Sequence, residues 1–220
     1  MKPLLMFLLA GIACAQEVNP DKRLEHATDA MRVFLSPDSN IPLGLIGKAQ
    51  CVVVMPRLMK GAFLFGGKYG RGFAACRKTA TTWSSPAAIA IEGGSFGPQL
   101  GGSATDLIML VMNQGGMARL LSDKFTLGGE IAIVQGPTGK DASLNTDVLM
   151  RAGMFSYSRA KGLFVGLSLE GATLRTDGGE NKKLYGHDVG NRDILMGKVP
   201  PPKGARAFLA LLNKRARKGK

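Results

Sequence analysis

The chain of 220 residues has few of the side chains on which most enzymes depend. It contains only 2 His, 3 Cys and 1 Trp. Neither His26 nor His187 has a second ligand at the spacing of a metal site, and no G-x-S-x-G phrase provides a nucleophile elbow. With so few histidines, a serine or cysteine triad would be hard to assemble. The sequence therefore favours a non-enzymatic protein without a metal ion or another cofactor.

Carboxylates leave one enzymatic alternative open. Five of them lie in or beside apolar segments: Glu92, Asp106, Glu130, Glu170 and Asp177. Nothing in the sequence selects two of them as an acid and base pair. Asp106 precedes a strongly apolar run, where a carboxylate more often accepts hydrogen bonds than transfers a proton. A hydrolase with an unrecognised carboxylate site, tested at Asp106 or Glu130, is the weaker alternative.

Long apolar runs are absent except near the N-terminus, where the sequence has the three parts of a secretory signal. Lys2 supplies positive charge, residues 4–12 are apolar, and Ala13-Cys14-Ala15 forms a small-x-small cleavage site. We expect residues 1–15 to be removed on export, which would place the protein in the periplasm or cell envelope of a bacterium. An uncleaved anchor and acylation of Cys14 stay open as alternatives.

Acidic residues are few relative to basic ones. The chain has 29 Lys and Arg against 16 Asp and Glu, a formal net charge of +13. This balance favours an anionic partner, such as nucleic acid, acidic lipid head groups or an acidic protein surface. Nucleic acid is disfavoured because the aromatic residues lie within apolar segments and do not alternate with Lys and Arg on an exposed face.

Two cysteines, Cys51 and Cys76, follow the predicted cleavage site. An oxidising compartment would permit a disulfide between them. Each also lies at the edge of an apolar, strand-like run, as expected for a buried free thiol. We expect free cysteines in the core, with the disulfide as the alternative.

The apolar periodicity predicts a few helices and a larger number of strands. Helices are predicted at residues 21–35, 114–121 and 205–212. Strands are predicted at residues 51–55, 62–65, 71–77, 87–91, 106–112, 125–133, 154–159 and 163–175, with residues 66–70 as a glycine-rich hairpin turn. Short connections between successive strands indicate an antiparallel sheet.

Basic residues gather near the predicted hairpin turns. They would form a cationic rim for anionic head groups if those turns meet at one end of the sheet; they are Lys60, Lys68, Arg71, Arg77, Arg159 and Lys161. The alternative is a solvated edge whose lysines discourage aggregation between strands.

The C-terminal segment combines apolar and basic residues, as an interfacial helix does. The candidate membrane contacts are Phe208, Leu211, Leu212, Lys214, Arg215, Arg217 and Lys218. The competing interpretation, which we favour, is a helix whose leucines dock on the sheet, followed by a solvated basic tail.

A series of aromatic and glycine-rich phrases runs through the middle of the chain. It includes Gly61-Ala62-Phe63, Trp83-Ser84-Ser85-Pro86, Phe125-Thr126-Leu127-Gly128-Gly129 and Tyr157-Ser158-Arg159-Ala160-Lys161-Gly162-Leu163-Phe164. In this order the phrases resemble the SYLF, or Ysc84-type, family from about residue 24 to residue 186. The resemblance implies a lipid-binding module. Eukaryotic members bind phosphoinositides and, in yeast-type proteins, actin. No catalytic residues are implied.

These observations together predict a single α+β domain with a curved, mainly antiparallel, half-barrel-like sheet and flanking helices. We place it at residues 16–198, followed by a Pro-rich spacer, C-terminal helix and basic tail over residues 199–220. The expected function is non-enzymatic binding of anionic or phosphoinositide-like phospholipid head groups at the bacterial cell envelope, through basic turns and apolar insertion. Export would separate the chain from cytosolic actin, which argues against actin binding. A periplasmic scaffold with an envelope protein partner is the alternative.

Overall fold

The computed structural model describes residues 19–36, 39, 41–62, 66–95, 103–129, 131–134, 153–161, 163–165 and 167–215. Residues 1–15, which the sequence predicts to be a signal peptide, and Glu130, Arg217 and Lys218 therefore lie outside the described residues. The strands are β1 (Cys51–Ala62), β2 (Gly66–Cys76), β3 (Ala87–Ser95), β4 (Ser103–Val111), β5 (Lys124–Thr126), β6 (Ile131–Val134), β7 (Met154–Ala160), β8 (Leu163–Val165) and β9 (Thr173–Thr176). The helices are α1 (Pro20–Phe34), α2 (Leu43–Lys48), α3 (Gln114–Leu120), α5 (Gly178–Tyr185), α6 (Asn191–Leu195), η1 (Lys203–Ala205) and α7 (Arg206–Arg215).

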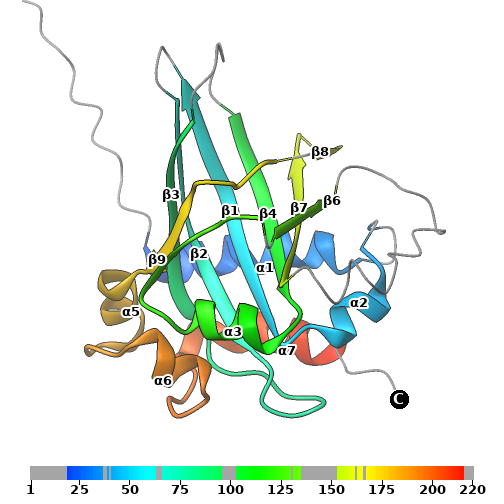
Figure 1. Ribbon diagram of the computed structural model, residues 1–220. Coiled ribbons are helices and arrows are strands. Elements are labelled where there is room, and N and C mark those ends of the chain that lie inside the picture. Colours follow the sequence, from blue (N-terminus) through cyan, green and yellow to red (C-terminus); the bar gives the residue numbers. More distant parts are fainter. Residues whose placement is uncertain are drawn as a thin grey trace, which may run out of the picture.

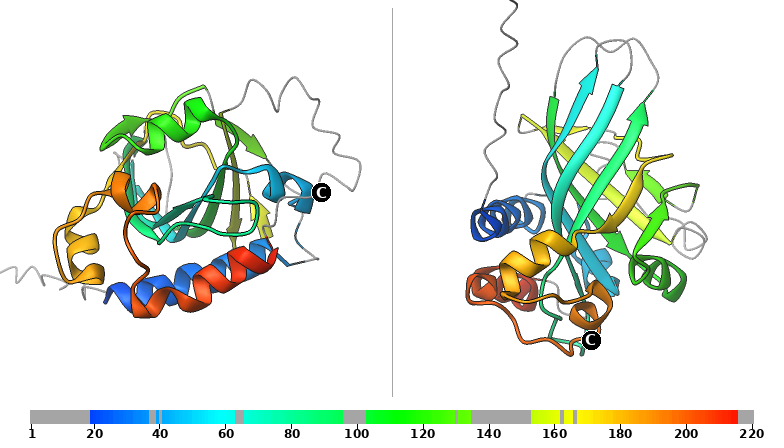
Figure 2. Two further views of the ribbon diagram at one scale, coloured as in Figure 1. Left: turned by 90° about the horizontal axis from the view of Figure 1, so that it is seen from below. Right: turned by 90° about the vertical axis from the view of Figure 1, so that its left-hand side faces the viewer.

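One sheet contains all nine of these strands. Its order is β5-β9-β3-β2-β1-β4-β7-β6, with β8 paired to β7. The pairings are antiparallel except for β6 with β7, which is parallel. The sheet curves strongly, and helices lie against its outside and near one end (Figures 1 and 2). The predicted α+β class with a curved, mainly antiparallel sheet is confirmed.

Alternating side chains divide the interior into two cores on opposite faces of the sheet. The outer core includes Val52, Val54, Phe73, Ile108 and Phe155 together with residues of α1, α2 and α7. The inner core, on the other face, includes Cys51, Val53, Met55, Ile89 and Met109 together with residues of α3, α6 and the segment before β9. The central strands β1, β2, β3 and β4 are therefore buried on both faces over most of their length, which explains their nearly continuous apolar runs.

Helix α1 forms where the periodicity predicts it. The Asn19 side chain caps it by accepting a hydrogen bond from the Asp21 backbone N–H at 2.9 Å, and Pro20 occupies the first turn. Its apolar face, with Leu24, Met31 and Phe34, packs into the outer core beside α7. Figure 2 shows α1 and α7 lying side by side against the outside of the sheet. None of the described helices is long and apolar enough to span a bilayer.

Three strand predictions are wrong in detail. Residues 66–70 belong to β2 and do not form a hairpin turn. Glycine is required in this strand because a Cβ on Gly72 would lie 2.1 Å from the Val54 carbonyl oxygen of β1. Residues 125–133 divide between β5 and β6 on opposite edges of the sheet, and residues 163–175 divide between β8 and β9. The helices α5 and α6 were not predicted.

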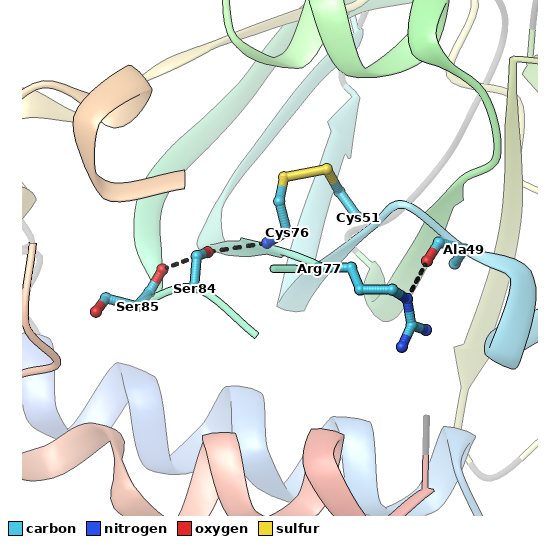
Figure 3. The surroundings of a disulfide bond; sticks show 6 residues. All are labelled: Ala49, Cys51, Cys76, Arg77, Ser84 and Ser85. Carbon is cyan, nitrogen blue, oxygen red and sulfur yellow. Dashed lines mark hydrogen bonds between the residues drawn. A yellow bond between two sulfur atoms is a disulfide. The ribbon is translucent and has the colours of Figure 1, made fainter. Parts of the chain in front are cut away.

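The expectation of free cysteines is also wrong. Cys51 and Cys76 are register partners on β1 and β2, and their sulfur atoms are bonded at 2.05 Å (Figure 3). Both side chains are fully buried in the inner core. Two cysteines 25 residues apart in the sequence meet because the hairpin brings opposite ends of its strands together.

Candidate functional site

Six strand ends meet at one end of the sheet. The antiparallel register brings together the ends of β1, β3 and β7 and the starts of β2, β4 and β8. Most of the helices lie towards the opposite end (Figure 1). We call this region the loop end and define it by six described side chains: Met59, Lys60, Lys68, Tyr69, Lys161 and Leu163. The ends of β1 and β2 and the ends of β7 and β8 therefore lie at the same end of the sheet, and the cationic rim stays a prediction.

Lys60 and Lys68 lie directly opposite each other on β1 and β2. Strand alternation from the buried Leu58 places Lys60 on the inner face, and Lys68 shares that face. Lys68 is only 8% exposed, and its ammonium donates a hydrogen bond to the Ser168 carbonyl oxygen at 2.8 Å. Burial and then the nearby positive charge of Lys60 lower the pKa of Lys68.

The turn between β7 and β8 presents a third lysine. Lys161 is exposed and has a φ of 47°, a left-handed conformation that the tight turn imposes. Arg159, two residues earlier, is half-buried and lies opposite Asp106 on β4. Lys161 therefore presents its charge to solvent at the loop end, whereas Arg159 lies lower on the sheet.

Three large apolar side chains are exposed at the same end. Leu163 is 71% exposed, Met59 52% and Tyr69 48%. Met59 and Tyr69 are cross-strand partners on the outer face, and Leu163 begins β8. The sequence analysis did not single out these side chains. Their only local signal in the sequence was an apolar residue one or two positions from a lysine, a pattern that buried strands also show.

Arg71 lies further along β2 and belongs to an internal ion-pair network. Its guanidinium contacts the Asp177 carboxylate at 2.5 Å and the Glu180 carboxylate at 3.3 Å, and Arg23 of α1 also pairs with Glu180. Glu180 is 1% exposed, so this network joins α1, β2 and α5 in a largely desolvated setting. The structure does not bring Arg71 to the loop end, and we leave it out of the candidate site.

Arg77 follows the far end of β2, next to the disulfide (Figure 3). Its guanidinium donates to the carbonyl oxygens of Ile46, Gly47, Ala49 and Ala80 at 3.0–3.4 Å. It also lies 4.4 Å from the centre of the Trp83 ring, in a cation–π contact. Burial lowers the pKa of Arg77. These contacts fix the end of α2 against the sheet, so Arg77 is also left out of the candidate site.

The C-terminal segment docks on the protein. Phe208 and Leu212 are fully buried in the outer core, and Leu211 packs against it. The docking part of the favoured interpretation is therefore confirmed for Phe208 and Leu212, and the basic tail after Arg215 lies outside the described residues. Lys214 is exposed, and Arg215 is the last residue of α7.

Three of the candidate carboxylates, Asp106, Glu92 and Asp177, form structural contacts, whereas Glu170 is exposed. Asp106 accepts a hydrogen bond from the Arg57 backbone N–H at 3.0 Å, which holds a bulge in β1 where Arg57 has a φ of 53°. A surface pocket of about 340 Å³ beside it contains Asp29, but Asp29 pairs with Arg32. Glu92 pairs with Arg175, and Asp177 caps α5. Within the described ranges, no three His, Cys, Asp or Glu side chains are placed to hold a metal ion.

Comparison with known proteins identifies one family. Residues 92–215 match the Ysc84 family model, described as "Las17-binding protein actin regulator". The chain is 36% identical over 187 residues to SH3 domain-containing protein PJ696.02 of Schizosaccharomyces pombe, a match that covers 83% of this chain and 43% of the relative. It is 32% identical over 200 residues to protein YSC84 of Saccharomyces cerevisiae, covering 86% and 42%. It is 32% identical over 178 residues to the human SH3 domain-containing YSC84-like protein 1, covering 80% and 52%. The chain thus spans about half the length of these relatives.

Proposed function

The chain belongs to the Ysc84 (SYLF) family, and from this membership we propose that it is a non-enzymatic binding module whose loop end docks on anionic phospholipid. One observation carries the proposal. Exposed apolar side chains and lysines occur together at the same end of the sheet, on separate hairpins that the fold brings together. Exposed apolar side chains that lie close together beside basic residues are typical of a surface that binds a membrane or another protein.

The two kinds of side chain would act together at a membrane surface. Leu163, Met59 and Tyr69 would enter the interface between head groups and acyl chains, where each buried Å² of apolar surface contributes about 25 cal/mol. Each lysine near an anionic leaflet adds about 1 kcal/mol. Lys60 and Lys161, the two accessible lysines at the loop end, would therefore contribute roughly 2 kcal/mol, and this share would decrease with rising salt because counterions screen exposed charges.

Export to a bacterial envelope belongs to the same proposal. The N-terminal sequence has the features of a secretory signal. The disulfide between Cys51 and Cys76 supports this assignment, because disulfides persist in oxidising compartments and are rare in the cytosol. The family description names Las17 and actin, so a protein partner is the second candidate function.

Vesicle co-sedimentation with matched variants tests the proposal. We expect the protein to sediment with phosphatidylglycerol vesicles at low salt and to remain in solution with phosphatidylcholine vesicles. Leu163→Ser and Lys161→Glu should each weaken binding several-fold. Met196→Ser and Lys203→Glu are the controls, because Met196 is 49% exposed and Lys203 is exposed, both in the helical part of the molecule. We expect these controls to bind like the natural protein.

Absence of sedimentation with anionic vesicles would refute the proposal. Equal losses for Lys161→Glu and Lys203→Glu would show that net charge alone drives the electrostatic part of binding, and equal losses for Leu163→Ser and Met196→Ser would refute the assigned surface. Indifference to lipid combined with capture of an envelope protein would favour the scaffold function.

A further inference from the structure

We propose that residues 199–204, which we call the proline segment, form a docking surface for a partner protein domain of the SH3 type. The groove of that domain would be lined by aromatic side chains and bordered by carboxylates. The inference goes beyond the proposed function, because it concerns a protein ligand at a different surface. The proline segment joins α6 to η1 and α7, which lie towards the end of the sheet opposite the loop end (Figure 1).

The backbone conformation of the proline segment follows from its sequence. The rings of Pro200, Pro201 and Pro202 hold φ near −65°. Each residue that precedes a proline, Val199 included, is restricted to extended values of ψ. Pro202 has a φ of −69° and a ψ of 161°. These angles are close to those of polyproline II, a left-handed helix with three residues per turn.

Burial along the proline segment repeats with the same period of three. Val199 and Pro202 are half-buried, and Ala205, the next residue in this series, is fully buried. The intervening positions 200, 201, 203 and 204 are exposed. One edge of the polyproline helix is therefore docked on the protein, and the other two edges face solvent. A partner groove can reach the two exposed proline rings without displacing the segment.

Hydrogen bonds hold the proline segment at both ends. The Ser85 hydroxyl donates to the Val199 carbonyl oxygen at 2.7 Å, and the Ala205 backbone N–H donates to the Pro202 carbonyl oxygen at 3.0 Å. Ala205 lies in the outer core, and Val199 packs against the inner core. The segment is thus fixed in the conformation that polyproline-binding grooves recognise, so a partner would lose little binding energy to ordering it.

A surface pocket of about 440 Å³ lies beside the three prolines. Leu184 and Tyr185 of α5 also line it. The Tyr185 hydroxyl donates to the Pro86 carbonyl oxygen at 2.7 Å, which fixes the position of the aromatic ring. Proline, leucine and tyrosine walls suit an aromatic side chain of a partner, because such a side chain gains most from apolar contact. Polar groups complete the lining: Asp21, His187 and Lys203.

Two basic residues follow the prolines. Lys203 and Arg206 are exposed, and neither forms an ion pair with a carboxylate of the described residues. Lys198, on the other side of the proline segment, pairs with Asp193 at 2.9 Å. The available positive charge therefore lies at the C-terminal end of the prolines. This order favours a groove with carboxylates at one end, and it sets the direction in which the segment would lie in the groove.

Binding to purified domains of the SH3, WW and EVH1 types, which recognise polyproline II, tests the inference. We expect saturable binding of SH3-type domains that carry carboxylates beside the aromatic groove. Pro200→Ala/Pro201→Ala should weaken binding by about tenfold through lost ring contacts, and Lys203→Glu by about tenfold through charge repulsion. Lys161→Glu is the control matched in charge, and it should bind these domains like the natural protein. Thermal midpoints close to that of the natural protein would show that the variants are folded.

Vesicle binding separates this inference from the proposed function. Lys203→Glu and Pro200→Ala/Pro201→Ala should sediment with phosphatidylglycerol vesicles like the natural protein, whereas Lys161→Glu should sediment less. We also expect an SH3-type domain to sediment with the vesicles only when the natural protein is present, because the two surfaces lie at opposite ends of the sheet.

Each result has a definite meaning. Binding to no domain of the panel, or equal binding by the natural protein and Pro200→Ala/Pro201→Ala, would overturn the inference and leave the proposed function standing. Binding that ignores Lys203→Glu would refute the groove bordered by carboxylates. Binding of an SH3-type domain by a protein that ignores vesicles would support the inference and refute the proposed function.

Discussion

The disulfide between Cys51 and Cys76 makes a quantitative prediction about stability. It links residues 25 positions apart. In the chain-entropy description, closing a loop of this length removes enough freedom from the unfolded chain to stabilise the fold by about 3.5 kcal/mol at 25 °C. Both sulfur atoms lie in the fully buried inner core, so reduction leaves two thiols in apolar surroundings that they tolerate. The effect should therefore come mainly from the unfolded state.

The predicted change is large enough to measure directly. For a domain of roughly 150–250 residues, 1 kcal/mol shifts the thermal midpoint by about 2–4 °C. The reduced protein should then melt about 7–14 °C below the oxidised protein. Urea unfolding followed by circular dichroism, with and without reductant, gives the free-energy difference for one unchanged sequence.

Two controls decide whether the disulfide is responsible. The variant Cys51→Ala/Cys76→Ala should melt near the reduced protein and should not respond to reductant. Alkylation in denaturant followed by peptide mapping should modify Cys51 and Cys76 only after reduction. Modification of both thiols in the untreated protein, or an unchanged midpoint on reduction, would refute the reasoning.

Three further predictions concern buried side chains. Tyr157→Phe should leave the free energy of unfolding unchanged or raise it by up to about 1 kcal/mol, because its buried hydroxyl has no hydrogen-bond partner within the described part of the chain. Burial raises the pKa of Tyr157 to about 12, against about 10 when unfolded, so its contribution to stability is fully present below pH 10 and is lost as pH rises through 12. Urea unfolding between pH 10 and pH 12 should show that the free energy of unfolding falls less steeply with pH in Tyr157→Phe than in the natural protein. An equal slope in the two proteins would contradict this prediction. Phe208→Ala should lower the free energy of unfolding by about 3–5 kcal/mol without weakening vesicle binding of the folded protein; weaker binding at unchanged stability would restore α7 as a membrane contact. Glu180→Gln should cost about 3 kcal/mol in chemical denaturation, because it removes the carboxylate that Arg23 and Arg71 share; a cost below about 1 kcal/mol would show that the network is not under desolvation.

The elements with local signals could be predicted from the sequence. The spacing of apolar residues and the Asn19 cap define α1 without any distant contact. Asp106 was correctly interpreted as a hydrogen-bond acceptor, because a carboxylate at the boundary of an apolar strand needs a donor. The aromatic and glycine-rich phrases predicted the family, which the comparisons confirm.

The prediction of a turn at residues 66–70 was wrong because glycine occurs both in turns and in closely packed strands. Gly66, Gly67 and Gly70 have the local signature of a turn, but they extend β2 by pairing with β1 and β3, and the neighbouring Gly72 lies against the Val54 backbone beside the bulge in β1. The same ambiguity affects the disulfide. Either state of Cys51 and Cys76 fits their local sequence, and only the register of the hairpin brings the sulfur atoms into bonding distance.

The candidate site shows most clearly which properties follow from the sequence and which depend on the tertiary structure. The sequence alone determined which residues carry positive charge and that several lie near turns. Only the tertiary structure decided that Arg71 neutralises carboxylates more than 100 residues away, that Arg77 binds the carbonyl oxygens near α2, and that Lys60 and Lys68 face each other. Charge is a property of the residue, whereas its availability depends on which partners the fold brings within a few ångströms. In an antiparallel sheet the strand register determines those partners, and the register cannot be read from the residues next to a given position in the sequence.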